Sequence, residues 1–289
     1  MPTKILNLPL KLFNAFERFW ENPKAYKVTA IILAGIFLLS LVVIEFNRQG
    51  LLPCGWQSVV PKNHFKAVEL AFYLLLIVEI LSLILLIGSS VSRAVGKELE
   101  ILALIMLRNA FKTLGNMHEP IDLAADKMAL FSIAANCVAA LLIFICKNIY
   151  ENIRNSSASA MGCEKEPAAY IAAKKYVALA LLILFTLDGA SHIAGLISGD
   201  ESLASQASFF ARFYTLLIFG DIFLLLAAEG AAHNAILLFR NTGYTAGALF
   251  MRLALGAPFF WDAGLGVFAA LYMVAISYTV RKLCSTCSV

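Results

Sequence analysis

The sequence has few charged residues and no long polar stretch. Asp, Glu, Lys and Arg make up 15% of its 289 residues, whereas 61% are hydrophobic and the mean hydropathy is +0.80. Outside the apolar runs no stretch exceeds about thirty residues, which leaves no room for a soluble domain of ordinary size. The net charge of +4 gives no nucleic-acid signature, because the basic residues lie at the ends of the apolar runs. These features indicate a membrane protein.

The sequence also lacks recognisable catalytic motifs. It contains no Gly-rich phosphate loop, no nucleophile elbow, no HExxH pair and no dinucleotide fingerprint. Its six cysteines lack the spacing of a secreted disulfide framework. Cys284 and Cys287 form a CxxC pair, which is either a metal or redox site or two reduced thiols on a short tail. We therefore expect no cofactor, and the absent motifs favour a protein that is not an enzyme.

The apolar runs have the length of membrane spans, since a helix needs about 20 mostly apolar residues to cross a bilayer. The runs that qualify on sight are 28–46, 67–88, 128–146, 176–197 and 207–228. Two further regions are judged from context. The segment 97–115 is polar, but its charges are tolerable if they face other helices. A Gly- and Pro-containing interruption divides the C-terminal run, which predicts a hairpin of two spans, 244–258 and 264–280.

The predicted fold is thus an all-α, polytopic transmembrane helix bundle of about eight spans. The alternatives are seven or six spans plus a re-entrant or interfacial segment. The domain organisation is an N-terminal amphipathic segment over residues 1–27, a transmembrane domain over 28–280 and a short tail over 281–289. With eight spans, most basic residues fall on one side, which places both termini in the cytoplasm of a cell whose inner membrane holds the protein.

Ionisable residues inside apolar runs mark pairs or pathways, because an unpaired charge in a bilayer costs several kcal/mol. Counting about 1.5 Å per helical residue from each expected turn matches Glu79 with Arg108. The same count brings Asp188 and His192 level with Arg212, and Glu229 level with Arg252, when the turn before the seventh span is placed near 239–244. Pairs of this kind are most simply structural.

Asp221 has no basic residue at its depth on either neighbouring span, so it is the better candidate for function. Such a carboxylate either carries a proton or cation, or is protonated and bonded to a more distant helix. A weaker metal or haem hypothesis comes from the repeated acid–x₃–His pattern, which includes His192 and His233. Depth counting argues against a shared site, because these two histidines lie toward opposite faces of the membrane.

Two functions of different classes follow. The first is a channel or transporter for a small ion or solute, with Asp221, Asp188, His192 and Arg212 along its pathway. The second is a scaffold or interaction subunit of a larger membrane complex, in which paired charges such as Glu79–Arg108 fix helix contacts. The expected partners are membrane lipids, with other membrane subunits or a second copy of the chain under the second hypothesis, and no nucleic acid. The sequence gives neither the substrate nor the oligomeric state.

Overall fold

The fold is entirely helical over the residues that the structure describes. The computed structural model describes 13–20, 22–51, 53, 60–114, 126–157, 168–198, 206–231, 235–258 and 261–287, and these ranges contain nine helices and no strand. A short helix covers residues 13–20. The long helices are α2 (Pro23–Arg48), α4 (Phe65–Ile87), α5 (Val91–Leu114), α6 (Lys127–Ser157), α7 (Ala168–Ser198), α9 (Gln206–Ala231), α10 (Ala235–Gly256) and α11 (Trp261–Cys287). The predicted all-α class is confirmed.

The helix ends follow local sequence signals. At the start of α2 the side chain of Asn22 accepts a hydrogen bond from the Lys24 backbone N–H, and Pro23 occupies the first turn, where no helical donor is lost. At its end, Gly50 adopts a φ of 71°, and its N–H donates to the Asn47 carbonyl at 3.1 Å. Glycine reaches this left-handed conformation at low cost. These signals define α2 as a single uninterrupted helix.

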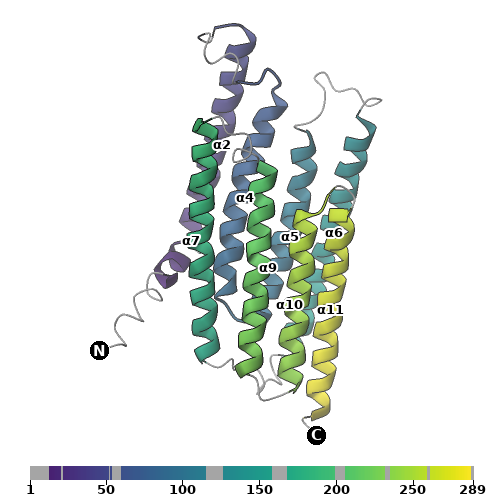
Figure 1. Ribbon diagram of the computed structural model, residues 1–289. Coiled ribbons are helices and arrows are strands. Elements are labelled where there is room, and N and C mark those ends of the chain that lie inside the picture. The colour runs from purple at the N-terminus through teal and green to yellow at the C-terminus, as the bar shows by residue number, and fades with distance from the viewer. Residues whose placement is uncertain are drawn as a thin grey trace, which may run out of the picture.

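The long helices run alternately up and down and form one elongated bundle (Figure 1). The start of α2 and the end of α11 therefore lie at the same end of the bundle, which we call the lower end, as in Figure 1. Helix α9 ends at Ala231 and α10 begins at Ala235. The sequence-based expectation placed this turn near 239–244, several residues too late. Helices α10 and α11 form the predicted C-terminal hairpin.

Six of the helices are long and apolar enough to cross a membrane. These candidate spans are 27–48, 65–87, 127–155, 170–195, 209–230 and 261–283. Helices α5 and α10 have comparable lengths of 24 and 22 residues, but they do not qualify on apolar composition. The expectation of about eight spans is thus supported for six. The physical reason is that α5 and α10 carry charged side chains that face other helices inside the bundle, as described below.

The interior divides into two hydrophobic cores. One core is built by α5, α6, α10 and α11, with Leu99, Ile143 and Met273 fully buried in it. The other is built by the helix at 13–20 with α4, α7 and α9, and it contains Ile80 and Phe213. We call the boundary between the two the seam. It runs between α4 and α5 and between α9 and α10, which pack directly against each other across it.

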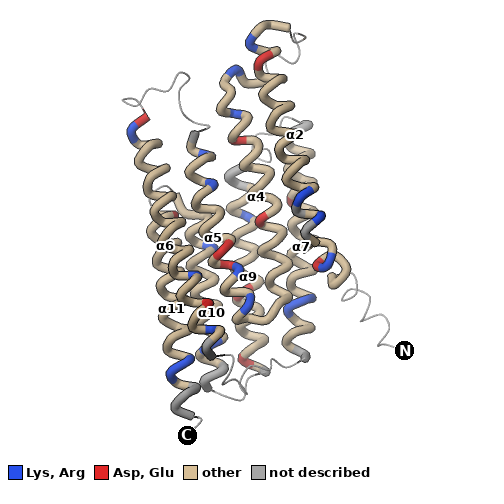
Figure 2. The backbone as a smooth tube through the Cα atoms, turned by 180° about the vertical axis from the view of Figure 1, so that it is seen from behind, with Lys and Arg blue, Asp and Glu red and all other residues tan. Residues whose placement is uncertain are grey.

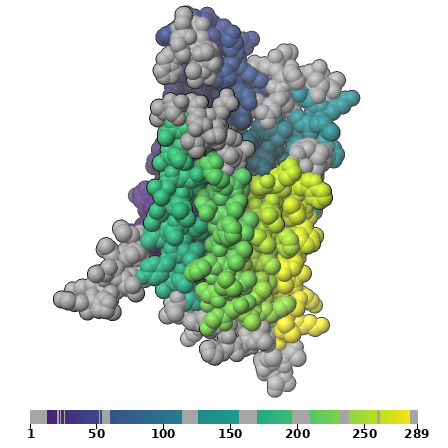
Figure 3. Space-filling model, viewed as in Figure 1, coloured from purple at the N-terminus to yellow at the C-terminus, as the bar shows by residue number. Residues whose placement is uncertain are grey.

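The outer elements are attached in different ways. In the space-filling view the side chains of α7, α9 and α11 cover one side of the bundle (Figure 3). Helix α2 packs mainly on α4 and leaves most of its apolar surface exposed. The helix at 13–20 is anchored by Phe13, which is 1% exposed, and by Trp20, whose Nε1 donates to Ser82 Oγ at 2.8 Å. It forms part of the expected amphipathic segment, whose first twelve residues lie outside the described ranges.

A glycine makes this anchoring possible. Gly88 lies in the turn between α4 and α5, directly against the ring of Phe13. A Cβ atom at this position would stand 2.7 Å from Phe13 Cε1, closer than such atoms approach in real structures. The absence of a side chain at Gly88 thus lets the N-terminal helix dock against the bundle.

A candidate charged site at the seam

Three charged side chains meet at the seam. Arg252 of α10 donates from Nε to Asp221 Oδ2 of α9 at 2.5 Å, and from Nη2 to Asp221 Oδ1 at 3.3 Å. The same Nη2 donates to Glu98 Oε1 of α5 at 3.3 Å. We refer to Glu98, Asp221 and Arg252 as the triad. Figure 2 shows that charged residues occur along the length of the bundle as well as at its two ends.

The triad is almost completely withdrawn from the surface. Arg252 is 1% exposed, Glu98 7% and Asp221 8%. The planar guanidinium binds Asp221 through two N–H donors, an arrangement that gives strong charge-assisted hydrogen bonds. Two carboxylates share this one cation, so the fully ionised triad carries a net charge of −1. Such a charge inside a membrane bundle is costly unless a further cation or proton neutralises it.

A small cavity with both polar and apolar lining adjoins the triad. Its volume is about 70 Å³, which is room for more than one water molecule. Glu98 and Asp221 form one part of its wall, and the remaining polar lining is contributed by Ser89, Tyr170, Lys174, Tyr244 and Thr245. The last five belong to the α4–α5 turn, the start of α7 and the lower half of α10. The cavity therefore extends from the triad toward the lower end of the bundle.

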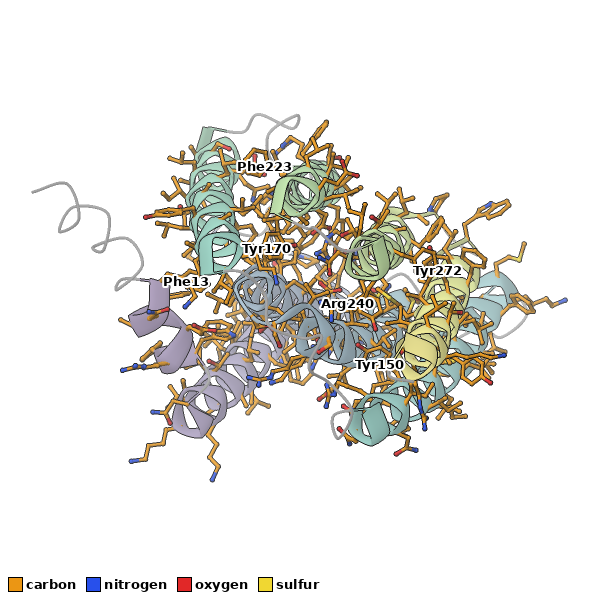
Figure 4. The ribbon with its side chains drawn as sticks, turned by 90° about the horizontal axis from the view of Figure 1, so that it is seen from below. Phe13, Tyr150, Tyr170, Phe223, Arg240 and Tyr272 are labelled. Atoms are coloured by element: carbon orange, nitrogen blue, oxygen red, sulfur yellow. The ribbon has the colours of Figure 1, made fainter. Side chains whose placement is uncertain are left out.

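Two buried cations lie on this lower side. Lys174 is 3% exposed; its Nζ donates to the Ser89 carbonyl at 3.1 Å and lies 4.7 Å from the centre of the Tyr170 ring. Arg240 is 5% exposed, donates to Asn241 Oδ1 at 3.4 Å, and lies near the centre of the bundle seen from below (Figure 4). The seam thus has a negative site at mid-height and positive groups nearer its lower end.

The partners of Asp221 and Arg252 in the structure differ from those predicted from the sequence. Asp221 was expected to lack a basic partner, and Arg252 was expected to pair with Glu229. Instead they bind each other, and Glu229 is exposed. The reason is the position of the α9–α10 break, which lies about eight residues earlier than expected. Since each helical residue adds about 1.5 Å, Arg252 stands far above Glu229 in the bundle.

The other two ion pairs that the sequence predicts are present in the structure. Arg108 of α5 forms an ion pair with Glu79 of α4, across the seam. Arg212 of α9 forms one with Asp188 of α7, with Nε and Oδ1 3.1 Å apart. In the second pair the arginine side chain is 41% exposed, so this pair is much more open to its surroundings than the triad.

The Asp188–Arg212 pair is separate from the triad. Asp221 lies nine residues beyond Arg212 on α9, about two and a half turns and about 13 Å, so the two side chains leave opposite faces of that helix. His192, one turn beyond Asp188, is 5% exposed and packs against the rings of Tyr73 and Phe209, with centroids 6.3 and 5.3 Å away. The expected pathway residues therefore form two clusters.

The described residues contain no group of three or more metal-ligating side chains. His192 lies in an aromatic environment, and its Nε2 has no hydrogen-bond partner among the described residues. His233, the other candidate of the metal hypothesis, lies outside them. The side chains of Cys284 and Cys287 are likewise outside the described part of the chain.

Sequence reasoning missed two residues of the site, Glu98 and Lys174. A signal existed for Glu98, because Val95, Glu98, Leu102 and Ile105 recur at three- and four-residue spacing and form the buried face of α5. A charged residue within such an apolar stripe predicts a buried partner. Lys174 carried no comparable signal, since it adjoins Lys175 at the end of an apolar run, where basic residues are common.

Comparison of the chain with protein-family models, with curated proteins and with solved structures finds no match. The fold and composition define its class. The chain is a polytopic integral membrane protein, with six apolar helices in contact with lipid. At its centre, two helical units meet at a buried charged site.

Proposed function

We propose that this protein moves a proton or a small cation across the membrane, and that the triad is the site that binds it. The observation that carries this proposal is the position of Glu98, Asp221 and Arg252 at the seam between two separate hydrophobic cores. Substrate sites of many transporters lie between two helical units that tilt against each other around the site. A purely structural ion pair has no need of such a position.

The charge of the triad indicates what it binds. Two carboxylates with one guanidinium leave one negative charge at the triad. Lys174, on the wall of the same cavity, offsets this charge until a proton or a monovalent cation binds. The adjoining cavity has room for water next to the triad and extends from it toward the lower end. When the cation binds, Arg252 keeps one carboxylate and the other becomes the ligand, so binding changes the bonds that hold α5, α9 and α10 together.

The proposed topology has eight membrane spans, of which α5 and α10 are the two polar ones. Their lengths match those of the apolar spans, and their charges are buried against neighbouring helices. A charged residue that faces the inside of a bundle does not prevent a helix from crossing. Both termini then lie on the same side, and the positive-inside rule favours the cytoplasm.

A flux assay tests this function. The purified protein is reconstituted in vesicles that contain a pH-sensitive dye, and a pH gradient or an alkali-cation gradient is applied. We expect flux with the wild type and its loss in Asp221→Asn and Glu98→Gln. Asp188→Asn is the matched control, because it removes the same charge from a pair outside the seam. Equal losses in Asp221→Asn and Asp188→Asn would contradict a specific role for the triad.

One observation favours the second function, that of an interaction subunit. Helix α2 packs mainly on α4, and its large apolar side chains Ile31, Leu38 and Leu39 are 71%, 61% and 64% exposed. Lipid covers such a surface, but a helix of another subunit or of a second copy would cover it as well. This function predicts no flux by the wild type, and a membrane partner that is lost when Leu38 and Leu39 are both replaced by Ala.

A further inference from the structure

A second cavity lies at the lower end of the bundle, outside the triad. Its volume is about 380 Å³, and it opens between the helix at 13–20, the α4–α5 turn, the start of α5 and the start of α7. Its lining residues are Asn14, Glu17, Arg18, Leu86, Ser89, Arg93, Lys97 and Lys175. We call it the basic cavity, because four of these residues are cationic and one is acidic.

The cations converge from three different elements. Arg18 comes from the N-terminal helix, Arg93 and Lys97 from α5, and Lys175 from α7. Lys175 is held in place by its Nζ, which donates to Asn14 Oδ1 at 2.6 Å. Four positive charges against one negative charge leave a strongly positive field in a concave site, and such a field concentrates anions.

The beginning of α5 makes this arrangement unfavourable without an anion. The N-terminal end of a helix carries a partial positive charge and is stabilised by acidic residues, yet the first turn of α5 contains none and has Arg93 instead. Lys97 follows four residues later on the same face, where like charges repel. An anion bound between these side chains would remove both penalties and would also meet the positive end of the helix.

We propose that the basic cavity binds a phosphate-bearing anion. Several oxygens on one phosphate match the planar donor fork of Arg18 and Arg93 and the point charges of the two lysines. The cavity lies beside the helix at 13–20, whose apolar side chain Phe19 is 64% exposed, as in a helix that lies at the membrane surface. The phosphate is thus carried either by an anionic lipid headgroup or by a free phosphate in solution. This site is independent of the triad and of the proposed transport.

Native mass spectrometry of the full chain in detergent tests the proposal. Phosphatidylglycerol, phosphatidylcholine or inorganic phosphate is added to the wild type and to the double variant Arg93→Gln/Lys97→Gln. We expect phosphatidylglycerol or inorganic phosphate to bind the wild type, and the double variant to bind it at least about tenfold more weakly. Without ligand the double variant should unfold at the same temperature as the wild type or higher, because it loses repulsive charges.

The matched control is Arg281→Gln/Lys282→Gln. It removes the same charge from exposed positions near the lower end of α11, away from the cavity, and should bind like the wild type. Competition by inorganic phosphate would identify the free anion as the ligand, whereas phosphatidylglycerol binding without competition would identify the lipid. The proposal is overturned if neither probe binds, if phosphatidylcholine binds equally well, or if the control loses as much affinity as the cavity variant.

Discussion

Arg252 and Asp221 join two helices that belong to different hydrophobic cores. Arg252 lies on α10, which packs with α5, α6 and α11, whereas Asp221 lies on α9, which packs with α4 and α7. Their two hydrogen bonds cross the seam at mid-height, and Glu98 binds the same guanidinium from the first unit. A buried ion pair with two hydrogen bonds is therefore placed at the boundary between the two units.

Removal of the arginine should destabilise the protein severely. Arg252→Ala leaves Glu98 and Asp221 buried without a cation, and the loss of one partner from a buried ion pair costs about 3–5 kcal/mol. The thermal unfolding of the purified variant in detergent measures this cost. Lys66→Ala is the control, because its ion pair with Glu69 lies partly exposed in the first turn of α4, at the end of a span, and its loss should cost less than about 1 kcal/mol. Similar costs for the two variants would contradict the buried character of the triad.

Removal of the whole triad should separate stability from transport. A variant with Glu98→Gln, Asp221→Leu and Arg252→Met removes every charge of the triad, and such replacements are often neutral or stabilising. We expect it to unfold within about 2 kcal/mol of the wild type and to show no flux in vesicles. The control Glu79→Leu/Arg108→Met replaces the other pair across the seam and should keep both stability and flux. Full flux without the triad would exclude its proposed role.

Much of the fold could be predicted because membrane spans are long and apolar. Five of the six apolar helices follow directly from composition, and the sixth follows from the Gly- and Pro-containing interruption of the C-terminal run. The pairs Glu79–Arg108 and Asp188–Arg212 follow from residue type and approximate depth. Composition alone could not place α5 and α10. Their charges are neutralised by residues far away in the sequence, as Glu98 is by Arg252, and a hydropathy profile contains no information about such partners.

The error at Asp221 has a specific physical origin. Depth counting depends on the position of each turn, and an error of one residue in a turn shifts the expected partner on the next helix by about 3 Å. The sequence before α10 lacks proline, and the expected turn near 239–244 falls inside α10, because α9 ends at Ala231 and α10 begins at Ala235. That shift moves the expected match of Arg252 from near Glu229 to about two helical turns from Asp221, a distance that the long arginine side chain and the helix packing make up.

The docking of the N-terminal helix should depend on Gly88. In Gly88→Ala the added methyl group meets the rigid ring of Phe13, and overpacking of this kind typically costs about 1–3 kcal/mol. We expect the helix at 13–20 to detach, so that trypsin cleaves after Arg18 faster than in the wild type. The control is Gly189→Ala in α7, where nothing lies within 4 Å of the new methyl group. It should leave cleavage unchanged, and equal cleavage in both variants would contradict the docking.

The last prediction concerns the membrane topology of α5, which must cross the membrane if the triad lies inside it. Ser90 directly precedes α5, and Lys127 follows the segment after α5; both are exposed. Single cysteines at these positions in a cysteine-free background should react with a membrane-impermeant maleimide from opposite sides. A third cysteine at Arg281, on the last turns of α11, should be labelled from the same side as Ser90→Cys, since both lie at the lower end. If Ser90→Cys and Lys127→Cys react from the same side, α5 does not cross. Glu98 would then lie outside the hydrocarbon, and the cost of its charge would no longer require a neutralising cation.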